Sequence, residues 1–238
     1  EQIVLGSPIR VRTRGAAGGQ TGWDGYSTGK NRGGGSGLNV IAELATPATI
    51  EGPYDTLIIT ERHDLVNTLI WEDTVKFVRH FHDRLVDGNP RGIPYVYHSW
   101  LSVQDRDDPS GFIAYERAIY PAWECVAERV HISLAAEGSS SEIVPLPAGI
   151  ALTDLVELAV AGDVEGLSES TTSATIDRIF ADAVHLTPLG AYYVSLVTFA
   201  TVYRRSPIGA SPPDGIDPGL AARLQAIAWD SVSRHFDT

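Results

Sequence analysis

The chain has 238 residues, 43% of them hydrophobic and 20% charged, and its formal net charge is −12. This length and composition exclude a wholly disordered chain and fit one large globular domain. The negative charge argues against nucleic acid as a partner, because a polyanion would meet a repulsive field.

No membrane span is expected. Residues 189–203 form the most apolar run, but they are too few to cross a bilayer and include Ser195, Thr198 and Thr201. The single cysteine, Cys125, cannot close an internal disulfide, and its helical surroundings predict a buried structural residue. The chain begins with Glu1 and contains no methionine. We therefore expect that a segment upstream of Glu1 was removed or left out, which would suit a periplasmic or secreted protein.

Short β-rich runs alternate with longer helical ones, the pattern of a parallel sheet covered by helices on both faces. Strands are expected at residues 2–5, 9–14, 56–60, 95–97 and 142–146. Helices are expected at residues 38–44, 72–86, 110–134, 151–160, 188–204 and 218–236. The prediction is a single α/β domain over residues 1–238, with three layers (α/β/α) and a mostly parallel sheet of about five strands.

Some of these segments carry further local predictions. The apolar, β-branched run TLIIT at residues 56–60 indicates a strand buried on both faces. A break is expected at Pro121 in the helix at 110–134. Thr153 or Asp154 is expected to cap the helix at 151–160.

The strongest chemical signal is Asp182 followed three residues later by His185, just before a predicted helix. A histidine that activates a hydroxyl needs a carboxylate on its other ring nitrogen, which holds the tautomer and stabilises the imidazolium. One short loop can bring both side chains together without long-range registration. In the simpler interpretation, Asp182 caps the helix and His185 faces solvent.

The block DAVHLTPLG at residues 182–190 resembles the last conserved block of the SGNH, or GDSL-like, hydrolase superfamily. The resemblance implies that Asp182 and His185 complete a Ser-His-Asp triad. Residues 54–61 are similar to the strand that precedes that family's Gly-x-Asn-Asp block, although Glu61-Arg-His63-Asp stands there instead. His63 then falls on the oxyanion-donating asparagine, and a neutral imidazole N–H could replace it as donor. Glu61 falls on the glycine and is expected to line the same cleft as His185.

The stretches at residues 95–100, 143–149 and 203–209 resemble a polysaccharide-esterase-like branch of the same superfamily. In that family the nucleophilic serine ends a first strand, and a later strand ends in an oxyanion-hole glycine. Ser7 is a poor nucleophile candidate, because only Pro8 separates it from the next predicted strand and a parallel crossover needs at least about a dozen residues. We assign Gly6 as the oxyanion donor, with Gly15 as the alternative, and place Ser7 and Gly15 in the cleft lining. The nucleophile block is expected upstream of Glu1.

The function that the resemblance implies is ester hydrolysis, in particular the removal of acetyl groups from a carbohydrate, with no metal or organic cofactor. A catalytically inactive hydrolase-like domain that binds a glycan or a protein partner is the alternative, which the missing serine favours. A third hypothesis is a carboxylate-based hydrolase that uses Glu61 and Asp182. No metal site is predicted, because His80 and His82 are two residues apart on a helix and point to different faces.

Overall fold

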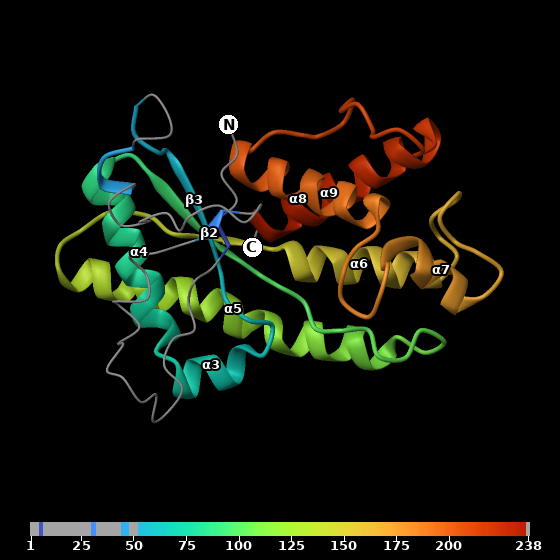
Figure 1. The fold of residues 1–238 in the computed structure, drawn as a ribbon, viewed down its shortest axis with the longest axis horizontal. Coiled ribbons are helices and arrows are strands. Elements are labelled where there is room, and N and C mark those ends of the chain that lie inside the picture. The colour runs from blue at the N-terminus through green and yellow to red at the C-terminus, as the bar shows by residue number, and fades with distance from the viewer. Residues whose placement is uncertain (1–4, 7–29, 32–43, 48–51, 237–238) are drawn as a thin grey trace. The chain divides into compact units, whose positions relative to one another are not determined.

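The computed structural model describes residues 5–6, 30–31, 44–47 and 52–236 and has a mixed α/β fold (Figure 1). A small parallel sheet has the strand order β3-β4-β5, formed by Thr56–Thr60, Ile93–Tyr97 and Val144–Leu146. A separate antiparallel pair joins β1 (Leu5–Gly6) to β2 (Lys30–Asn31). The helices of the described part are α3 (Leu65–Trp71), α4 (Thr74–Gly88), α5 (Ser110–Ala136), α6 (Ala148–Val160), α7 (Thr172–Ile179), α8 (Pro188–Tyr203) and α9 (Pro218–Phe236).

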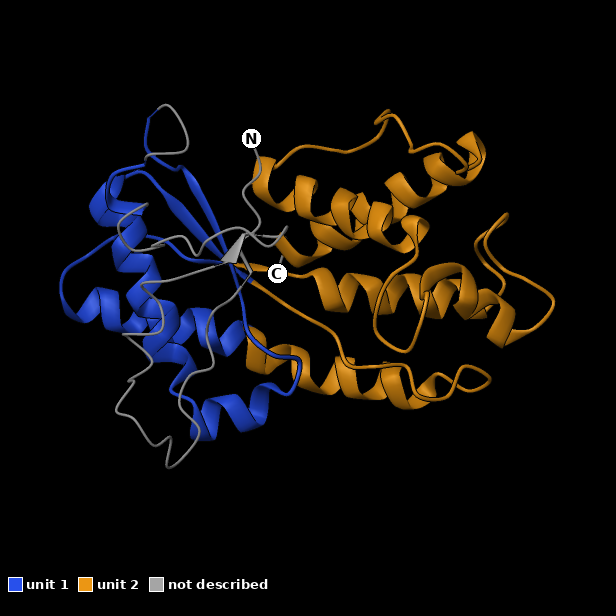
Figure 2. Ribbon diagram, in the orientation of Figure 1, with its two compact units in different colours: residues 1–96, 124–144 blue, residues 97–123, 145–238 orange. Residues whose placement is uncertain are grey.

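The chain divides into two compact units, which Figure 2 colours separately. Unit 1 comprises residues 1–96 and 124–144, and unit 2 comprises residues 97–123 and 145–238. Strands β4 and β5 and helix α5 each have residues in both units. The single domain expected from the sequence therefore stays a prediction.

Each unit has an apolar interior of its own. In unit 1, Phe77, Phe81 and Leu85 of α4 pack with Leu44, and Leu57 and Ile59 of β3 pack against them. In unit 2, α6 contacts α7, α8 and α9. Its Leu152 and Leu155 are fully buried, so α6 is the central helix of that unit. None of the described helices combines the length and apolar character of a bilayer span.

The mixed α/β class and most elements follow the sequence prediction. The bounds of β3 and α9 are those expected, and α4, α5, α6 and α8 differ at one or both ends. Two short helices, α3 and α7, were not predicted. The described residues contain a three-stranded parallel sheet, not the five-stranded sheet that was expected. Of the expected strands, most of 2–5 and all of 9–14 lie outside the described residues.

Several local predictions are wrong for physical reasons. Strand β3 is not buried on both faces: Ile58 is 41% exposed, and β3 has a described partner on one side only. Pro121 lies inside α5 without ending it. The tertiary packing of buried α5 side chains such as Trp123 and Val130 offsets the cost of a helical proline, about 3 kcal/mol. Cys125 is exposed, because it lies on the outer face of the same helix.

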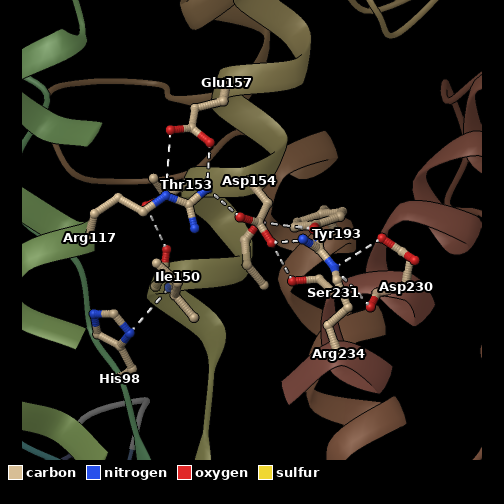
Figure 3. Close-up of polar contacts among 12 residues, drawn as sticks. His98, Arg117, Ile150, Thr153, Asp154, Glu157, Tyr193, Asp230, Ser231 and Arg234 are labelled. Carbon is tan, nitrogen blue, oxygen red and sulfur yellow. Dashed lines mark hydrogen bonds and ion pairs between the residues drawn. The ribbon is translucent and has the colours of Figure 1, made fainter. Parts of the chain in front are cut away.

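The cap predicted for α6 is also wrong, because the helix begins at Ala148 instead of near residue 151. The Thr153 hydroxyl donates to the Gly149 carbonyl one turn back, at 2.9 Å. Asp154 is buried in the helix interior and joins three helices (Figure 3). Its carboxylate accepts hydrogen bonds from Arg117 of α5 at 2.6 Å and from Ser231 and Arg234 of α9 at 2.7 and 3.2 Å. This carboxylate therefore links α6 to α5 and α9 and does not cap α6.

Candidate active site

The Asp182–His185 pair lies on a closed loop between α7 and α8. The loop is held at its base by an antiparallel bridge between Phe180 and Leu186. The Ala181 N–H donates to the His185 carbonyl at 2.8 Å, and the Thr187 N–H donates to the Ile179 carbonyl at 2.9 Å. Phe180 is fully buried and anchors the loop in unit 2. The loop is therefore a small fixed turn with both ends secured.

The residues that follow the histidine start α8. The Thr187 side chain caps the helix by accepting from the Gly190 N–H at 3.2 Å, and Pro188 occupies the first turn, where its missing N–H costs nothing. A Cβ at Gly190 would lie 2.4 Å from the Ile179 carbonyl oxygen, so the close approach of α7 and α8 requires glycine. The Thr, Pro and Gly of the block thus set the position of the loop relative to α8.

Asp182 and His185 form the hydrogen bond that the sequence predicts. The Asp182 Oδ2 lies 2.7 Å from the His185 Nδ1. The other carboxylate oxygen accepts the backbone N–H groups of His185 and Val184 at 2.7 and 2.8 Å. These two backbone bonds, and then the bond from the His185 ring, hold the pKa of Asp182 well below its ordinary value. Asp182 is therefore an ionised acceptor over the whole physiological pH range.

An ionised carboxylate at Nδ1 keeps the proton of a neutral imidazole on that nitrogen and leaves Nε2 as the acceptor. Within the described residues, no hydrogen-bond partner occupies Nε2. The side chains of His185 and Asp182 are 79% and 57% exposed. This arrangement can take a proton from a hydroxyl that approaches Nε2 and can stabilise the imidazolium that forms.

The loop is also tied to the segment that leaves the carboxyl end of β4. The indole N–H of Trp100 donates to the Val184 carbonyl at 2.9 Å, and the Val103 N–H donates to the Ala183 carbonyl at 2.7 Å. Open α/β sheets bind their ligands at the carboxyl ends of their strands. Trp100 therefore uses the polar edge of its indole to hold this loop.

Glu61 and His63, the other described side chains proposed for the site, belong to unit 1. Glu61 follows the carboxyl end of β3, as expected, and accepts hydrogen bonds from the Arg62 N–H at 2.8 Å and the Thr74 hydroxyl at 3.0 Å. Burial raises the pKa of Glu61, and these hydrogen bonds offset only part of the effect. His63 is exposed in the connection between β3 and α3. A common cleft of Glu61 with His185, and the oxyanion role of His63, stay predictions.

The proposed N-terminal part of the site is described only at Gly6. Gly6 lies in β1, where it pairs with Lys30 in an antiparallel register. Ser7 and Gly15 lie outside the described residues. The role of Gly6 as oxyanion donor therefore stays a prediction. In the described part of the chain, no group of three or more His, Cys, Asp or Glu side chains is arranged to hold a metal ion.

Sequence reasoning missed a second carboxylate–imidazole pair, His98 and Glu116, which lies in unit 2 with the first. The side chains of His98 and Glu116 are 1% and 0% exposed, and Nε2 lies 2.8 Å from Oε2. A signal for it exists in the sequence, because Glu116 falls on the helical stripe that buries Phe112, Ile119 and Trp123. A charged residue on an apolar stripe requires a buried partner.

No protein-family model and no curated protein matches the sequence. Among solved structures, the fold is similar to the crystal structure of a DUF4886 family protein from Bacteroides uniformis. The TM-score is 0.58 at 15% sequence identity, over 86% of this chain and 69% of that protein. At this identity the likeness concerns the fold alone.

Proposed function

We propose that this protein is a serine-type ester hydrolase in which Asp182 orients His185 and His185 is the general base. The observation that carries the proposal is the 2.7 Å contact between the Asp182 carboxylate and the His185 Nδ1, with the opposite edge of the ring toward solvent. A carboxylate that fixes the tautomer and an accessible Nε2 are the two requirements for activating a hydroxyl.

The block that contains the pair supports an SGNH-like architecture. Its Thr187 and Pro188 begin α8, and its Gly190 allows α7 to approach α8, so these three positions of the block each have a structural reason. The proposal includes the three-layer α/β/α arrangement with a sheet of about five strands. The oxyanion donors would be Gly6 or Gly15 and His63, with Glu61 and Ser7 lining the cleft.

In the proposed reaction the His185 Nε2 accepts the proton of a serine hydroxyl as its oxygen attacks the ester carbonyl. Asp182 stabilises the imidazolium, which then returns the proton to the departing alcohol. A water molecule then attacks the acyl-enzyme: the His185 Nε2 accepts a proton from the water and donates it to the departing serine oxygen. The substrate class, an O-acetylated carbohydrate, rests on the resemblance to the polysaccharide-esterase-like branch.

The test is ester hydrolysis by the full-length protein, with 4-nitrophenyl acetate and O-acetylated xylan as substrates. His185→Ala should lower kcat/KM by roughly 10³-fold or more. The matched control is His131→Ala, since His131 lies on α5 in unit 1, where its Nε2 accepts the Ile143 N–H and its Nδ1 lies 3.7 Å from the Glu128 carboxylate. The control should keep wild-type activity.

A fluorophosphonate probe locates the nucleophile. It should modify one serine of the wild-type protein, and peptide mass spectrometry identifies that serine. His185→Ala should react far more slowly. A protein that hydrolyses neither ester and takes up no probe would contradict the hydrolase, and the inactive glycan- or protein-binding domain would replace it.

A further inference from the structure

The buried His98–Glu116 pair is connected to the Asp182–His185 loop through one short segment, residues 98–103. We infer that His98 and Glu116 are positioning residues for the dyad: they fix this segment, and the segment fixes the loop. The inference rests on the proposed function for its catalytic meaning, but its geometric content can be tested without activity.

The protonation pattern of the pair follows from its hydrogen bonds. The Ile150 N–H donates to the His98 Nδ1 at 3.1 Å (Figure 3), so Nδ1 carries no proton. The proton of the ring is then on Nε2 and is donated to the Glu116 carboxylate at 2.8 Å. The other Glu116 oxygen accepts the Leu101 N–H at 2.6 Å. One carboxylate thus holds the segment at two points, through the His98 ring and through the Leu101 backbone.

The His98 ring has no room to adopt another position. Its faces contact Tyr120 and Trp123 of α5, with ring centroids 5.5 and 5.2 Å apart. A Cβ at Gly149 would come within 2.7 Å of the ring. The His98 backbone is held as well, because its N–H donates to the Leu146 carbonyl at 3.0 Å. Because the enclosed ring cannot rotate away, a displacement of the Glu116 carboxylate should move His98 and the segment that follows it.

The segment contacts the loop on both sides of Leu101. Trp100 and Val103 donate to the carbonyls of Val184 and Ala183, the two residues between Asp182 and His185. The N–H of Val184 donates to Asp182 in turn. The peptides that orient the Asp182 carboxylate are therefore held by Trp100 and Val103, which lie one and two residues from Leu101. A shift of Leu101 reaches the dyad through two hydrogen bonds.

Glu116→Gln tests the first connection. A glutamine has one acceptor oxygen for the two N–H donors, so its NH2 group must face one of them and release it. The measurement is the tautomer of neutral His185, read from long-range ¹H–¹⁵N correlations of the imidazole. In the wild-type protein the Nδ1–H form should dominate, because Asp182 accepts that proton. In Glu116→Gln the Nε2–H form, preferred by histidine in water, should gain population. The kcat should fall roughly 10-fold to 100-fold, with a smaller change in KM.

The matched control is Glu128→Gln, an exposed carboxylate on the same helix, which should leave the His185 tautomer unchanged. Trp100→Phe tests the second connection independently, since it keeps an aromatic ring, removes the indole N–H that donates to Val184 and leaves both hydrogen bonds of Glu116 in place. It should shift the His185 tautomer in the same direction and leave the His98 signals as they are. If Glu116→Gln fails to fold, as circular dichroism would reveal, Trp100→Phe carries the test alone.

The outcomes separate this inference from the proposed function. A wild-type protein that hydrolyses no ester, together with the expected tautomer shift, refutes the hydrolase and keeps the positioning. Folded Glu116→Gln and Trp100→Phe proteins whose His185 tautomer matches wild type would overturn the positioning, whatever the activity.

Discussion

Unit 2 contains two carboxylate–imidazole pairs with nearly the same separation, 2.7 Å for Asp182–His185 and 2.8 Å for Glu116–His98. Their surroundings are opposite, since the first pair is largely exposed and the second is enclosed. The two pairs also differ in which imidazole nitrogen contacts the carboxylate. Asp182 binds Nδ1 and leaves Nε2 toward solvent, whereas Glu116 binds Nε2 and the Ile150 N–H occupies Nδ1.

A short carboxylate–imidazole contact therefore does not by itself identify a catalytic pair. The second ring nitrogen decides whether the pair can act as a general base, because this chemistry needs an acceptor that a substrate proton can reach. His98 has no such nitrogen, so its pair can only stabilise and position. His185 has one, so its pair can react. Substitutions in the exposed pair should therefore lower activity far more than stability, and substitutions in the buried pair should have their larger effect on stability.

The largest expected effect is on activity. Asp182→Asn keeps an oxygen for the backbone N–H groups but turns an NH2 toward the His185 Nδ1, which selects the wrong tautomer. We expect kcat to fall roughly 10³-fold to 10⁴-fold, while the free energy of unfolding changes little, because the side chain is exposed and water screens its charge. Ester hydrolysis and urea denaturation measure the two quantities. The control is Asp214→Asn, at an exposed position before α9, which should keep full activity. An active Asp182→Asn enzyme would remove the dyad from the mechanism.

The second prediction is that a substitution in the buried pair has its main effect on stability. Glu116→Ala leaves the enclosed His98 Nε2–H and the Leu101 N–H without an acceptor. We expect the free energy of unfolding to fall by about 3–5 kcal/mol, measured by urea denaturation followed by circular dichroism. His185→Ala, the exposed counterpart, should cost less than about 0.5 kcal/mol. Equal costs for the two variants would show that the difference in burial does not govern these pairs.

The two pairs also mark the limit of sequence reasoning. Asp182 and His185 were predictable because a local block places them on one loop, where three residues of spacing fix the contact. His98 and Glu116 are 18 residues apart, and they meet because the segment after β4 lies against α5, where His98 also contacts Tyr120 and Trp123. Their pairing depends on tertiary geometry, which spacing does not encode. The misplaced start of α6 has the same origin, because Asp154 looks like a cap locally but faces Arg117 and Ser231 from other helices.

Asp154 is a buried carboxylate without an imidazole partner, so it shows what burial alone does to stability. We expect a third, smaller effect from its substitution. Its carboxylate is buried but faces two arginines that are partly exposed. We expect Asp154→Ala to lower the free energy of unfolding by about 2 kcal/mol, less than Glu116→Ala, because the released arginines can reach water. Asp154→Asn should cost less again, since it keeps an acceptor for Ser231. The control is Asp230→Ala on α9, an exposed residue, with a change below about 0.5 kcal/mol.

The fourth prediction concerns Glu61, whose pKa is raised by burial. The folded state then holds the carboxyl proton more tightly than the unfolded chain does. Stability therefore falls as the pH rises from the ordinary value of 4.5 through the raised folded pKa, and the penalty is complete above it. Glu61→Gln carries no such penalty. The unfolding free energy of Glu61→Gln minus that of wild type should be more positive at pH 7 than at pH 4. A difference that is equal at both pH values would contradict the raised pKa.

The smallest expected effect concerns what holds Asp182 in place. Its lowered pKa means that its contribution to stability is present above the ordinary value of 3.8 and is lost as the pH falls through the folded pKa. The contribution is modest because the side chain is exposed and water screens it. The main causes of the low pKa are the backbone N–H groups of His185 and Val184, and the His185 ring comes third. His185→Ala keeps both backbone donors, so the pKa of Asp182 should rise only in part and stay below 3.8, as the ¹³C carboxyl shift of Asp182 against pH would measure. A return to the ordinary value would make the ring the main cause. A pKa that stays low would mean that the loop backbone holds the carboxylate in place before the imidazole binds it, as the positioning role of His98 and Glu116 requires.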